Sequence, residues 1–387
     1  MKVALVHDWL TGMRGGEKVL ERFALMFPDA PIYTLVWNRG SVSEAIESHR
    51  IRTSFLQRMP AIATHYRWYL PLFPAAIEGM TLEGFDAVIS SSHAVARAVR
   101  TPPGTFHLSY IHTPMRYVWD LEDQYFPPGR FPWPVSWYVR GTCARLRRWD
   151  TRTSDRPHAL LTNSANVAER IARHYRRSAE VVHGPVDVAR LQPGAGPRAY
   201  DLVVGAFAPN KRVDLAVEAA RRAQRPLVVA GSGPEEGRLR RIAGPGTRFL
   251  GWVDDAALAR LYAGARMLLF PGEEDFGLVP IEAMASGTPV VAFGRGGVLE
   301  TVGRGADPGT LAGVAAGGAA VVPGGVLFGR QTVDGLIEAI QLADATRFDP
   351  ATLHAHATPF DVPAFDARFR EAFERAYAAW RERQGRG

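Results

Sequence analysis

Two glutamates and a pair of glycines stand close together in residues 270–302. Glu274 and Glu282 are separated by seven residues, and Gly296 and Gly297 follow a short apolar run. A carboxylate can accept two hydrogen bonds from a vicinal diol, and backbone N–H groups at the start of a helix attract phosphate. This combination suits a ligand that carries both hydroxyls and phosphate, which is the chemistry of a nucleotide sugar.

Lysine is rare in this chain, and its few positions are informative. Of the 46 basic residues only three are lysines, Lys2, Lys18 and Lys211. An ammonium is a compact point charge, whereas a guanidinium is a planar fork. Lys18 follows Gly15 and Gly16 at an expected helix start, and Lys211 stands just before another. Both positions favour an anionic group such as a diphosphate.

His112 directly follows the expected strand 107–111. Ligands of open α/β sheets bind beyond the carboxyl ends of the strands, so we expect a functional role for His112 and leave a purely structural one open. The single cysteine, Cys143, excludes an internal disulfide and a cysteine-rich zinc site.

The segments that must position these residues alternate between short apolar runs and longer amphipathic ones, which predicts parallel sheets flanked by helices. Expected strands cover 2–6, 31–36, 87–90, 107–111, 160–163, 180–182, 201–204, 226–230, 247–250, a run ending at 270, and 289–293. Helices are expected at 17–27, 165–174 and 213–222, together with a short helix that begins near Pro280 and ends at Gly287 and a further helix after the glycine loop 294–297. Residues 303–325 are expected to form a loop with a small helix. The glycines near residue 15 lack the G-x-G-x-x-G spacing, which argues against a nicotinamide cofactor.

Prolines and glycines between residues 184 and 199 indicate a linker, so the chain is expected to form two domains, 1–190 and 198–362. We predict that both are doubly wound Rossmann-like α/β domains facing each other across a cleft. The remaining residues, 363–387, carry an apolar stripe at helical spacing. This last helix is expected to cross back toward the first domain.

Positive charge is concentrated in the first half of the chain. Residues 1–192 contain 24 Arg and Lys against 17 Asp and Glu, whereas residues 193–387 contain 22 of each kind. Aromatic residues are interleaved with the arginines in 50–80 and 126–157. This pattern favours an anionic membrane surface or a lipid-linked substrate. Nucleic acid and a solvated basic face stay open, although no nucleic-acid recognition motif accompanies the charge.

The apolar run at the N-terminus is too short for a signal peptide, and no run reaches the length of a membrane-spanning helix. We therefore expect a cytoplasmic protein, with peripheral contact to the inner face of the cell membrane as a further expectation.

Taken together, the motifs resemble those of the group 1, or family 4, retaining glycosyltransferases with the GT-B fold. The resemblance rests on Glu-Asp-Phe-Gly-Leu-Val-Pro-Ile-Glu from residue 274, Ala-Pro-Asn-Lys-Arg-Val-Asp from residue 208, Gly-Ser-Gly-Pro from residue 231, Phe-Leu-Gly-Trp-Val from residue 249 and Gly-Gly-Val-Leu-Glu-Thr-Val from residue 296. It extends to His-Asp-Trp-Leu from residue 7 and Tyr-Ile-His-Thr-Pro from residue 110. The chain is most similar to bacterial mannosyltransferases of O-antigen and exopolysaccharide synthesis.

The resemblance implies roles for the candidate residues. Glu282 would bind the ribose hydroxyls and Glu274 the hydroxyls of the donor sugar, while Lys211 and Arg212 would neutralise the diphosphate. Further substrate-binding residues implied by the motifs are Gly15, Gly16 and Lys18 near the diphosphate, His112 at the reacting face of the sugar, Gly251 and Trp252 near the nucleobase, the N–H groups of Gly296 and Gly297, and Arg116, Phe276, Gly277 and Leu278. His112, Glu274 and Lys211 are the expected catalytic residues.

The activity implied is transfer of a hexose, with GDP-mannose as the favoured donor, to a hydroxyl of a lipid-linked or oligosaccharide acceptor. No metal and no cofactor are expected. A UDP-hexose donor and a sugar-nucleotide epimerase of the same fold are the alternatives, and too few lysines are present for a pyridoxal phosphorylase. Ala206 stands where many relatives have an arginine, so one phosphate contact is missing or comes from Arg212. Catalysis is expected to depend on closure of the two domains.

Overall fold

The computed structural model describes residues 1–387 except 121, 123–125, 128, 130–131 and 386–387. Three residues of the aromatic and basic stretch 126–157, numbers 128, 130 and 131, therefore lie outside the described residues. The chain divides into two compact units. Unit 1 is Met1–Gly184 with Asp366–Gly387, and unit 2 is Pro185–Phe365.

Unit 1 is built on a seven-stranded sheet in the order β3-β2-β1-β4-β5-β6-β7, in which every pair of neighbours is parallel. The strands are β1 (Val3–His7), β2 (Ile32–Thr34), β3 (Ile51–Thr53), β4 (Ala87–Ser92), β5 (Phe106–Ile111), β6 (Ala159–Thr162) and β7 (Glu180–Val181). The first strand lies inside the sheet and the chain winds outward from it in both directions. The topology therefore reverses between β1 and β4, which is where such sheets bind ligands.

Helices cover both faces of this sheet because the central strands are buried on both sides. They are α1 (Gly15–Met26), α2 (Glu44–Glu47), α3 (Ile62–His65), α4 (Phe73–Glu78), α6 (Trp133–Arg152), α7 (Ala165–Tyr175) and α15 (Val362–Gln384). Short 3-10 helices cover Phe55–Arg58 (η1), Tyr66–Leu72 (η2) and Ala96–Ala98 (η3). One core cluster joins Val6 and Val88 of the sheet to Phe73, Ile77 and Leu146.

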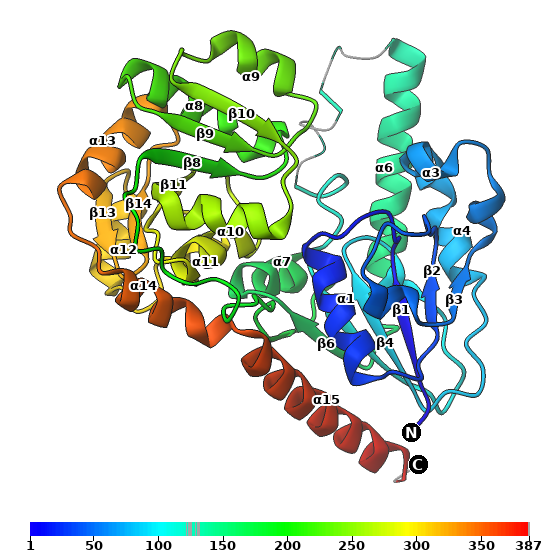
Figure 1. The fold of residues 1–387 in the computed structure, drawn as a ribbon. Helices are drawn as coiled ribbons and strands as arrows, with labels where there is room; N and C mark the ends of the chain where they lie inside the picture. The colour runs from blue at the N-terminus through cyan, green and yellow to red at the C-terminus, as the bar shows by residue number, and fades with distance from the viewer. Residues whose placement is uncertain (121, 123–125, 128, 130–131, 386–387) are drawn as a thin grey trace. The chain divides into compact units, whose positions relative to one another are not determined.

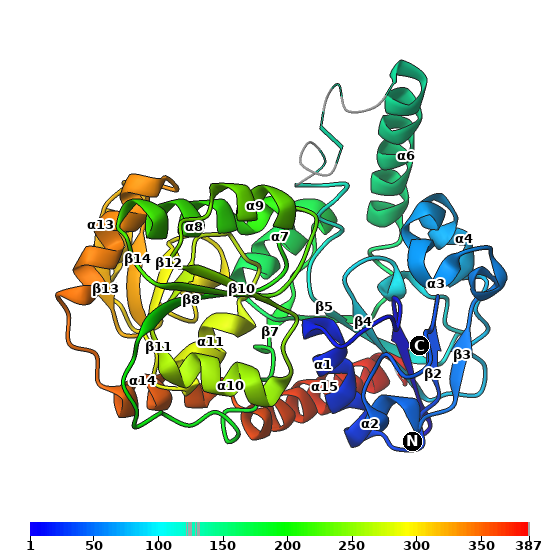
Figure 2. The same ribbon diagram turned by 45° about the horizontal axis from the view of Figure 1, so that its top comes forward.

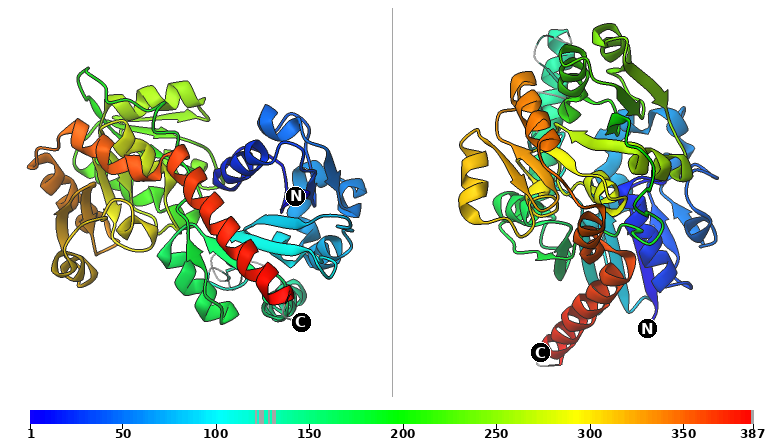
Figure 3. Two further views of the ribbon diagram at one scale, coloured as in Figure 1. Left: turned by 90° about the horizontal axis from the view of Figure 1, so that it is seen from below. Right: turned by 60° about the vertical axis from the view of Figure 1, so that its left-hand side comes forward.

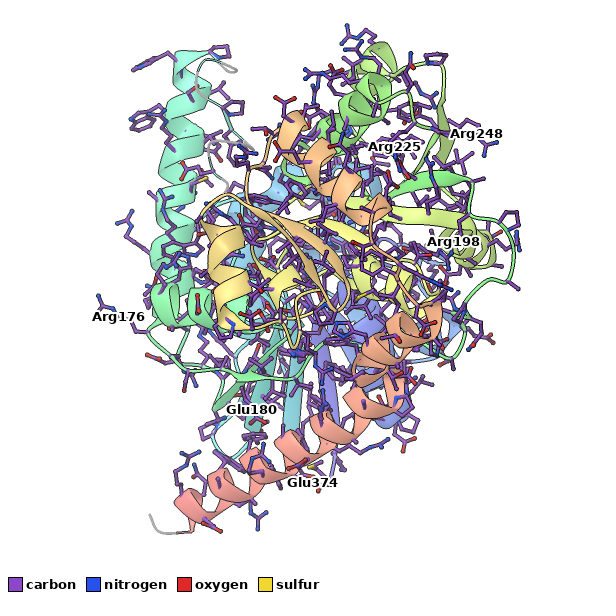
Figure 4. The ribbon with its side chains drawn as sticks, turned by 90° about the vertical axis from the view of Figure 1, so that its left-hand side faces the viewer. Arg176, Glu180, Arg198, Arg225, Arg248 and Glu374 are labelled. Atoms are coloured by element: carbon purple, nitrogen blue, oxygen red, sulfur yellow. The ribbon has the colours of Figure 1, made fainter. Side chains whose placement is uncertain are left out.

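The C-terminal helix α15 packs on unit 1, as Figure 3 shows. The ring of Phe369 lies 4.4 Å from that of Phe23 on α1, and Phe373 lies 5.9 Å from Phe106 on β5. Farther along the helix, Arg375 forms an ion pair with Glu180 of β7 at 2.6 Å. Figure 4 labels Glu180 and also Glu374, the residue that precedes Arg375. The apolar stripe of this helix is thus buried against the first sheet although its sequence follows unit 2.

Helix α6 stands out from unit 1 (Figures 1 and 2). Its buried residues are Thr142, Cys143, Leu146, Trp149 and Asp150, all from the middle of the helix to its C-terminal end. The first half exposes Trp133 by 80% and Trp137 by 73%. Burial raises the pKa of the Cys143 thiol to about 11, which fits a structural cysteine. In the described residues, no helix, α6 included, is both long and apolar enough to cross a membrane.

Unit 2 repeats the architecture with a second seven-stranded sheet, ordered β10-β9-β8-β11-β12-β14-β13. Its strands are β8 (Tyr200–Val204), β9 (Leu227–Ala230), β10 (Thr247–Gly251), β11 (Ala265–Phe270), β12 (Val290–Phe293), β13 (Ala319–Val322) and β14 (Gly325–Phe328). All pairs are parallel except β13 with β14. Topology reverses between β8 and β11. Together with unit 1 this confirms the prediction of two doubly wound α/β sheets.

The helices of unit 2 are α8 (Val213–Arg222), α9 (Glu236–Ile242), α10 (Asp255–Gly264), α11 (Leu278–Ala285), α12 (Pro308–Ala315), α13 (Val333–Asp344) and α14 (Pro350–Ala357). Short 3-10 helices cover Pro209–Lys211 (η4), Gly297–Leu299 (η5) and Thr358–Phe360 (η6). Two arginines labelled in Figure 4, Arg198 and Arg225, connect segments of unit 2 that are far apart in the sequence. Arg198 donates to the carbonyls of Ala265 at 2.8 Å and Gly287 at 2.7 Å. Arg225 pairs with the buried Asp201 at 2.6 Å.

One strand was missed, and two expectations about elements were wrong. Residues 51–53 form β3 inside the segment expected to be an aromatic surface, because Ile51 pairs in register with Ile32. Residues 303–325 are more than a loop with a small helix, since they contain β13 and the first residue of β14. The segment after Gly296 forms only the 3-10 turn η5 instead of a full helix.

Candidate functional site

The reversal point of unit 2 carries two of the predicted residues. Lys211 lies at the end of the loop after β8, and Glu274 lies in the loop after the neighbouring strand β11. The Lys211 Nζ and a Glu274 Oε form an ion pair. Both side chains are only partly exposed, 30% for Lys211 and 15% for Glu274. An ammonium is therefore held at the sheet edge where a phosphate ligand is expected.

Close packing of loop backbones fixes this pair. A Cβ on Gly272 would lie 2.8 Å from the Lys211 Cα, so only glycine allows the two loops to meet. The loop after β9 contacts the loop after β8 equally closely, because a Cβ on Gly231 would lie 1.9 Å from the carbonyl oxygen of Gly205. The ion pair thus rests on backbone contacts among the loops after three adjacent strands.

Gly296 and Gly297 contact the glutamate loop directly. Gly296 has φ +74° and bridges to Glu274, and the Gly297 N–H donates to the Glu274 carbonyl at 2.9 Å. The Gly297 N–H is therefore already bonded in this structure, and the role of the N–H groups near Gly296 and Gly297 in holding a diphosphate stays a prediction. A Cβ on Gly297 would lie 2.3 Å from the Phe276 Cα. These glycines serve to bring the two loops together and so to place Glu274.

Glu282 lies inside α11 and is 6% exposed. The hydroxyl of Tyr262, which is fully buried on α10, donates to Glu282 Oε2 at 2.9 Å. Burial raises the pKa of Tyr262, and the neighbouring Glu282 carboxylate raises it further. A neutral phenol therefore orients the carboxylate. Tyr262 was missed by the sequence reasoning because it occupies an ordinary position in an amphipathic helix.

Four other predicted residues of unit 2 make contacts within the protein or lie at the start of a helix. The Arg212 guanidinium donates to Asp214 at 3.1 and 3.2 Å, so its charge is directed at the first turn of its own helix. Phe276 is 4% exposed and packs 5.8 Å from Phe360, so its side chain belongs to the core. Gly277, with φ +91°, precedes α11, and Leu278 is the first residue of that helix.

Gly251 and Trp252 lie at the end of β10, the edge strand of this sheet. The Gly251 carbonyl accepts from the Gly231 N–H at 2.7 Å, which links this loop to those around Lys211. Trp252 is 81% exposed and offers a flat apolar surface to solvent or to a ligand.

In unit 1 the predicted residues gather around the reversal point between β1 and β4. Gly15 and Gly16 are the first two residues of α1, and the half-buried Lys18 lies in its first turn. A Cβ on Gly16 would lie 3.6 Å from His112 Nε2, so the start of α1 lies against the histidine that follows β5. Arg116 is half-buried in the turn after His112.

A known protein family matches part of the chain, and the matched residues all lie in unit 2. Residues 200–342, which lie in unit 2, match the family model described as glycosyl transferases group 1. Unit 2 contains a group 1 glycosyltransferase domain. This confirms the resemblance of the motifs to those of the group 1 glycosyltransferases. The match covers the loops with Lys211 and Glu274 and the helix with Glu282, so the glycosyltransferase domain includes all three.

Two curated relatives illustrate the range of the family. A GDP-mannose-dependent alpha-mannosyltransferase of Mycolicibacterium smegmatis is 31% identical over 178 residues, which are 43% of this chain and 47% of that protein. A glycogen synthase of Mycobacterium tuberculosis is 32% identical over 191 residues, 43% of this chain and 45% of that protein. The chain thus spans about half the length of the curated relatives it matches.

A solved structure extends the likeness to the whole fold. Anabaena HepE, in complex with UDP and glucose, matches with a TM-score of 0.68 and 16% identity over 97% of this chain and 99% of that chain. At this identity the likeness concerns the fold, which is that of the GT-B glycosyltransferases.

Several polar residues near His112 were missed by the sequence reasoning. The Asp8 carboxylate accepts from four consecutive backbone N–H groups, those of His93, Ala94, Val95 and Ala96, at 2.6–2.9 Å. His7, Glu17 and Ser91 are buried in the same region. The available signal was the polar run Ser-Ser-Ser-His at residues 90–93, which ends a strand at a binding edge. In the residues that the structure describes, no group of three or more His, Cys, Asp or Glu is arranged to hold a metal ion.

Proposed function

We propose that the protein transfers a sugar from a nucleoside diphosphate sugar to an acceptor hydroxyl, with retention at the anomeric carbon. The observation that carries this proposal is the Lys211–Glu274 ion pair at the reversal point of the sheet in the glycosyltransferase domain. It provides a cation for a diphosphate and a carboxylate for hydroxyl groups at one place.

The proposed chemistry breaks the bond between the anomeric carbon and the diphosphate oxygen. The ammonium of Lys211 stabilises the negative charge that develops on this oxygen. The acceptor oxygen then bonds to the same face of the sugar, and its proton passes to the departing phosphate. Glu274 orients Lys211 and accepts from a sugar hydroxyl, and Glu282 accepts from the ribose hydroxyls.

GDP-mannose is the donor that we favour, because the name of one relative specifies it. A UDP-hexose is the alternative, since the HepE structure that shares the fold holds UDP and glucose. The stacking partner of the base in this proposal is Trp252, whose exposed ring accepts either base.

Thermal unfolding in the presence of a panel of nucleotide sugars tests the proposed function. A ligand that binds only the folded protein stabilises it by about 2.7 kcal/mol at a concentration 100 times its Kd. We expect one member of the panel to raise the melting temperature and Glu282→Ala to reduce this rise. An unchanged rise in Glu282→Ala would refute the ribose assignment.

The acceptor that we propose is a sugar linked to a polyprenyl diphosphate, and unit 1 would meet it at the membrane. Helix α6 stands beside α3 and α4 in both Figure 1 and Figure 2. Besides Trp133 and Trp137 it exposes Tyr138 by 55%, and Trp68 of η2 is exposed by 73%. Arg140, Arg145 and Arg148 lie on the same helix. Exposed aromatic rings next to arginines are typical of proteins that lie on anionic lipid.

Replacing Trp133 and Trp137 together with serine should reduce binding to vesicles that contain anionic lipid, because two interfacial rings are lost. Flotation of the protein with vesicles of phosphatidylglycerol and phosphatidylcholine measures the bound fraction. Trp252→Ser is the matched control, since it removes an equally exposed ring from unit 2. Equal flotation of the double variant and the wild type would contradict the membrane proposal.

A further inference from the structure

A chain of polar side chains leads from α1 through the sheet of unit 1 to His112. Glu17 Oε1 lies 3.7 Å from His7 Nε2, and the other ring nitrogen of His7, Nδ1, lies 3.1 Å from Ser91 Oγ. Ser91 Oγ in turn lies 2.8 Å from His112 Nε2. His7 and Ser91 are register partners on β1 and β4, so the sheet itself sets their spacing.

The burial of these groups makes their hydrogen bonding restrictive. His7 and Ser91 are 0% exposed, and Glu17 is 2% exposed. A serine hydroxyl has one proton, so it can donate to only one of its two histidine neighbours and must accept from the other. The direction of the Ser91 hydroxyl therefore couples the proton positions of His7 and His112.

The carboxylate end of the chain decides that direction. Burial alone raises the pKa of Glu17, but the interaction with His7, whose Nε2 lies 3.7 Å away, lowers it below its ordinary value with a contribution from His93. A bare His7 Nε2 would point its lone pair at the lone pairs of this carboxylate, so a His7 ring that carries one proton holds it on Nε2. Its Nδ1 then accepts from the Ser91 hydroxyl, and Ser91 Oγ accepts from His112 Nε2.

We propose that Glu17, His7 and Ser91 are positioning residues that hold the His112 proton on Nε2 and leave Nδ1 as a hydrogen-bond acceptor for a ligand hydroxyl. Burial, aided by the neighbouring His93 and His7, lowers the pKa of His112 well below its ordinary value, which agrees with a neutral ring. The identity of the ligand hydroxyl as that of a saccharide rests on the proposed function. The proton positions assigned to His7, Ser91 and His112 do not depend on the proposed function.

The ligand chemistry follows from the tautomer. A His112 with a bare Nδ1 accepts a hydrogen bond from a hydroxyl and offers no donor to a phosphate oxygen from that nitrogen. His112 would thus select a hydroxyl of the sugar or of the acceptor, while the lysines serve the phosphates.

Nuclear magnetic resonance of the free protein, with ¹⁵N-labelled histidine, tests the relay at pH 7 without any substrate. The chain has 11 histidines, and the signals of His112 are identified by their loss in His112→Asn. We expect the wild type to show a slowly exchanging proton on His112 Nε2. Ser91→Ala should abolish its protection from exchange. Glu17→Gln should raise the fraction of His112 protonated on Nδ1, although Glu17 does not contact His112.

Ser90→Ala is the matched control. Ser90 is the neighbouring residue on β4, and its hydroxyl lies 2.8 Å from Nε2 of a different buried histidine, His107. This variant loses the same atom and the same kind of hydrogen bond, and it should leave the His112 signals unchanged. A wild-type His112 protonated on Nδ1, or His112 signals that are identical in Ser91→Ala and the wild type, would overturn the proposal. Since no turnover is measured, such a result would leave the proposed function standing.

Discussion

Replacing Lys211 with alanine should lower kcat/KM for the nucleotide-sugar donor about 10²–10³-fold, the usual effect of removing one group that stabilises developing negative charge. The fold should be retained, because the Lys211 side chain is 30% exposed and the loop is held by backbone contacts at Gly272. The loss should appear in kcat as well as in kcat/KM, since the leaving oxygen becomes more negative in the transition state. Release of the nucleoside diphosphate measures the rate.

Two further variants sharpen this result. Lys211→Arg keeps the charge but exchanges a point charge for a planar fork, so it should recover part of the activity. Arg221→Ala removes a cation that is paired with Glu218 on the exposed side of α8, and it should have little effect. A threefold change in kcat/KM corresponds to less than about 1 kcal/mol of transition-state stabilisation. If Lys211→Ala stays within about threefold of the wild type, Lys211 does not stabilise the leaving group.

Replacing Asp150 with alanine should cost unit 1 about 3–5 kcal/mol of its free energy of unfolding, as expected when one partner of a buried ion pair is removed. Asp150 is 0% exposed and pairs with Arg97, which is 1% exposed. The same carboxylate accepts from Trp119 Nε1 and from the Tyr175 hydroxyl, each at 2.8 Å. Alanine would leave a buried guanidinium, the buried Tyr175 hydroxyl and the partly buried Trp119 N–H without this acceptor.

Urea unfolding followed by tryptophan fluorescence measures this loss. Eight of the nine tryptophans lie in unit 1 and only Trp252 lies in unit 2, so the signal reports on unit 1. The double variant Arg97→Met with Asp150→Ala should lose less than the single one, because no charge is left unpaired. Glu169→Ala on exposed α7 surface should change the free energy by no more than about 0.5 kcal/mol. A loss below about 1 kcal/mol in Asp150→Ala would show that the pair is not needed for stability.

The local chemistry of the loops could be predicted from the sequence because it depends on residues close together in the chain. Helix α8 begins and ends where its pattern indicated, and Lys211 is the last residue of the 3-10 turn η4 that leads into it. The order of elements also sufficed to predict two doubly wound sheets. Strand β3 was missed because Arg52 and Thr53 are exposed and give no apolar alternation.

Contacts between distant residues could not be predicted in the same way. Lys211 and Glu274 were assigned to different parts of the ligand, and the structure pairs them with each other. The N–H of Gly297 is taken by the carbonyl of Glu274, which only the meeting of two loops reveals. The link from Glu17 to His112 crosses three elements and depends on the register of β1 with β4.

The measurement that most directly tests the central claim is the anomeric configuration of the sugar first formed from the donor that stabilises the protein. The purified protein is incubated with this donor and a polyprenyl-diphosphate-linked sugar, and ¹H NMR follows the anomeric proton. The account predicts release of the nucleoside diphosphate and a product with the same anomeric configuration as the donor. Inversion of that configuration, or no nucleoside diphosphate released from any donor of the panel, would contradict it.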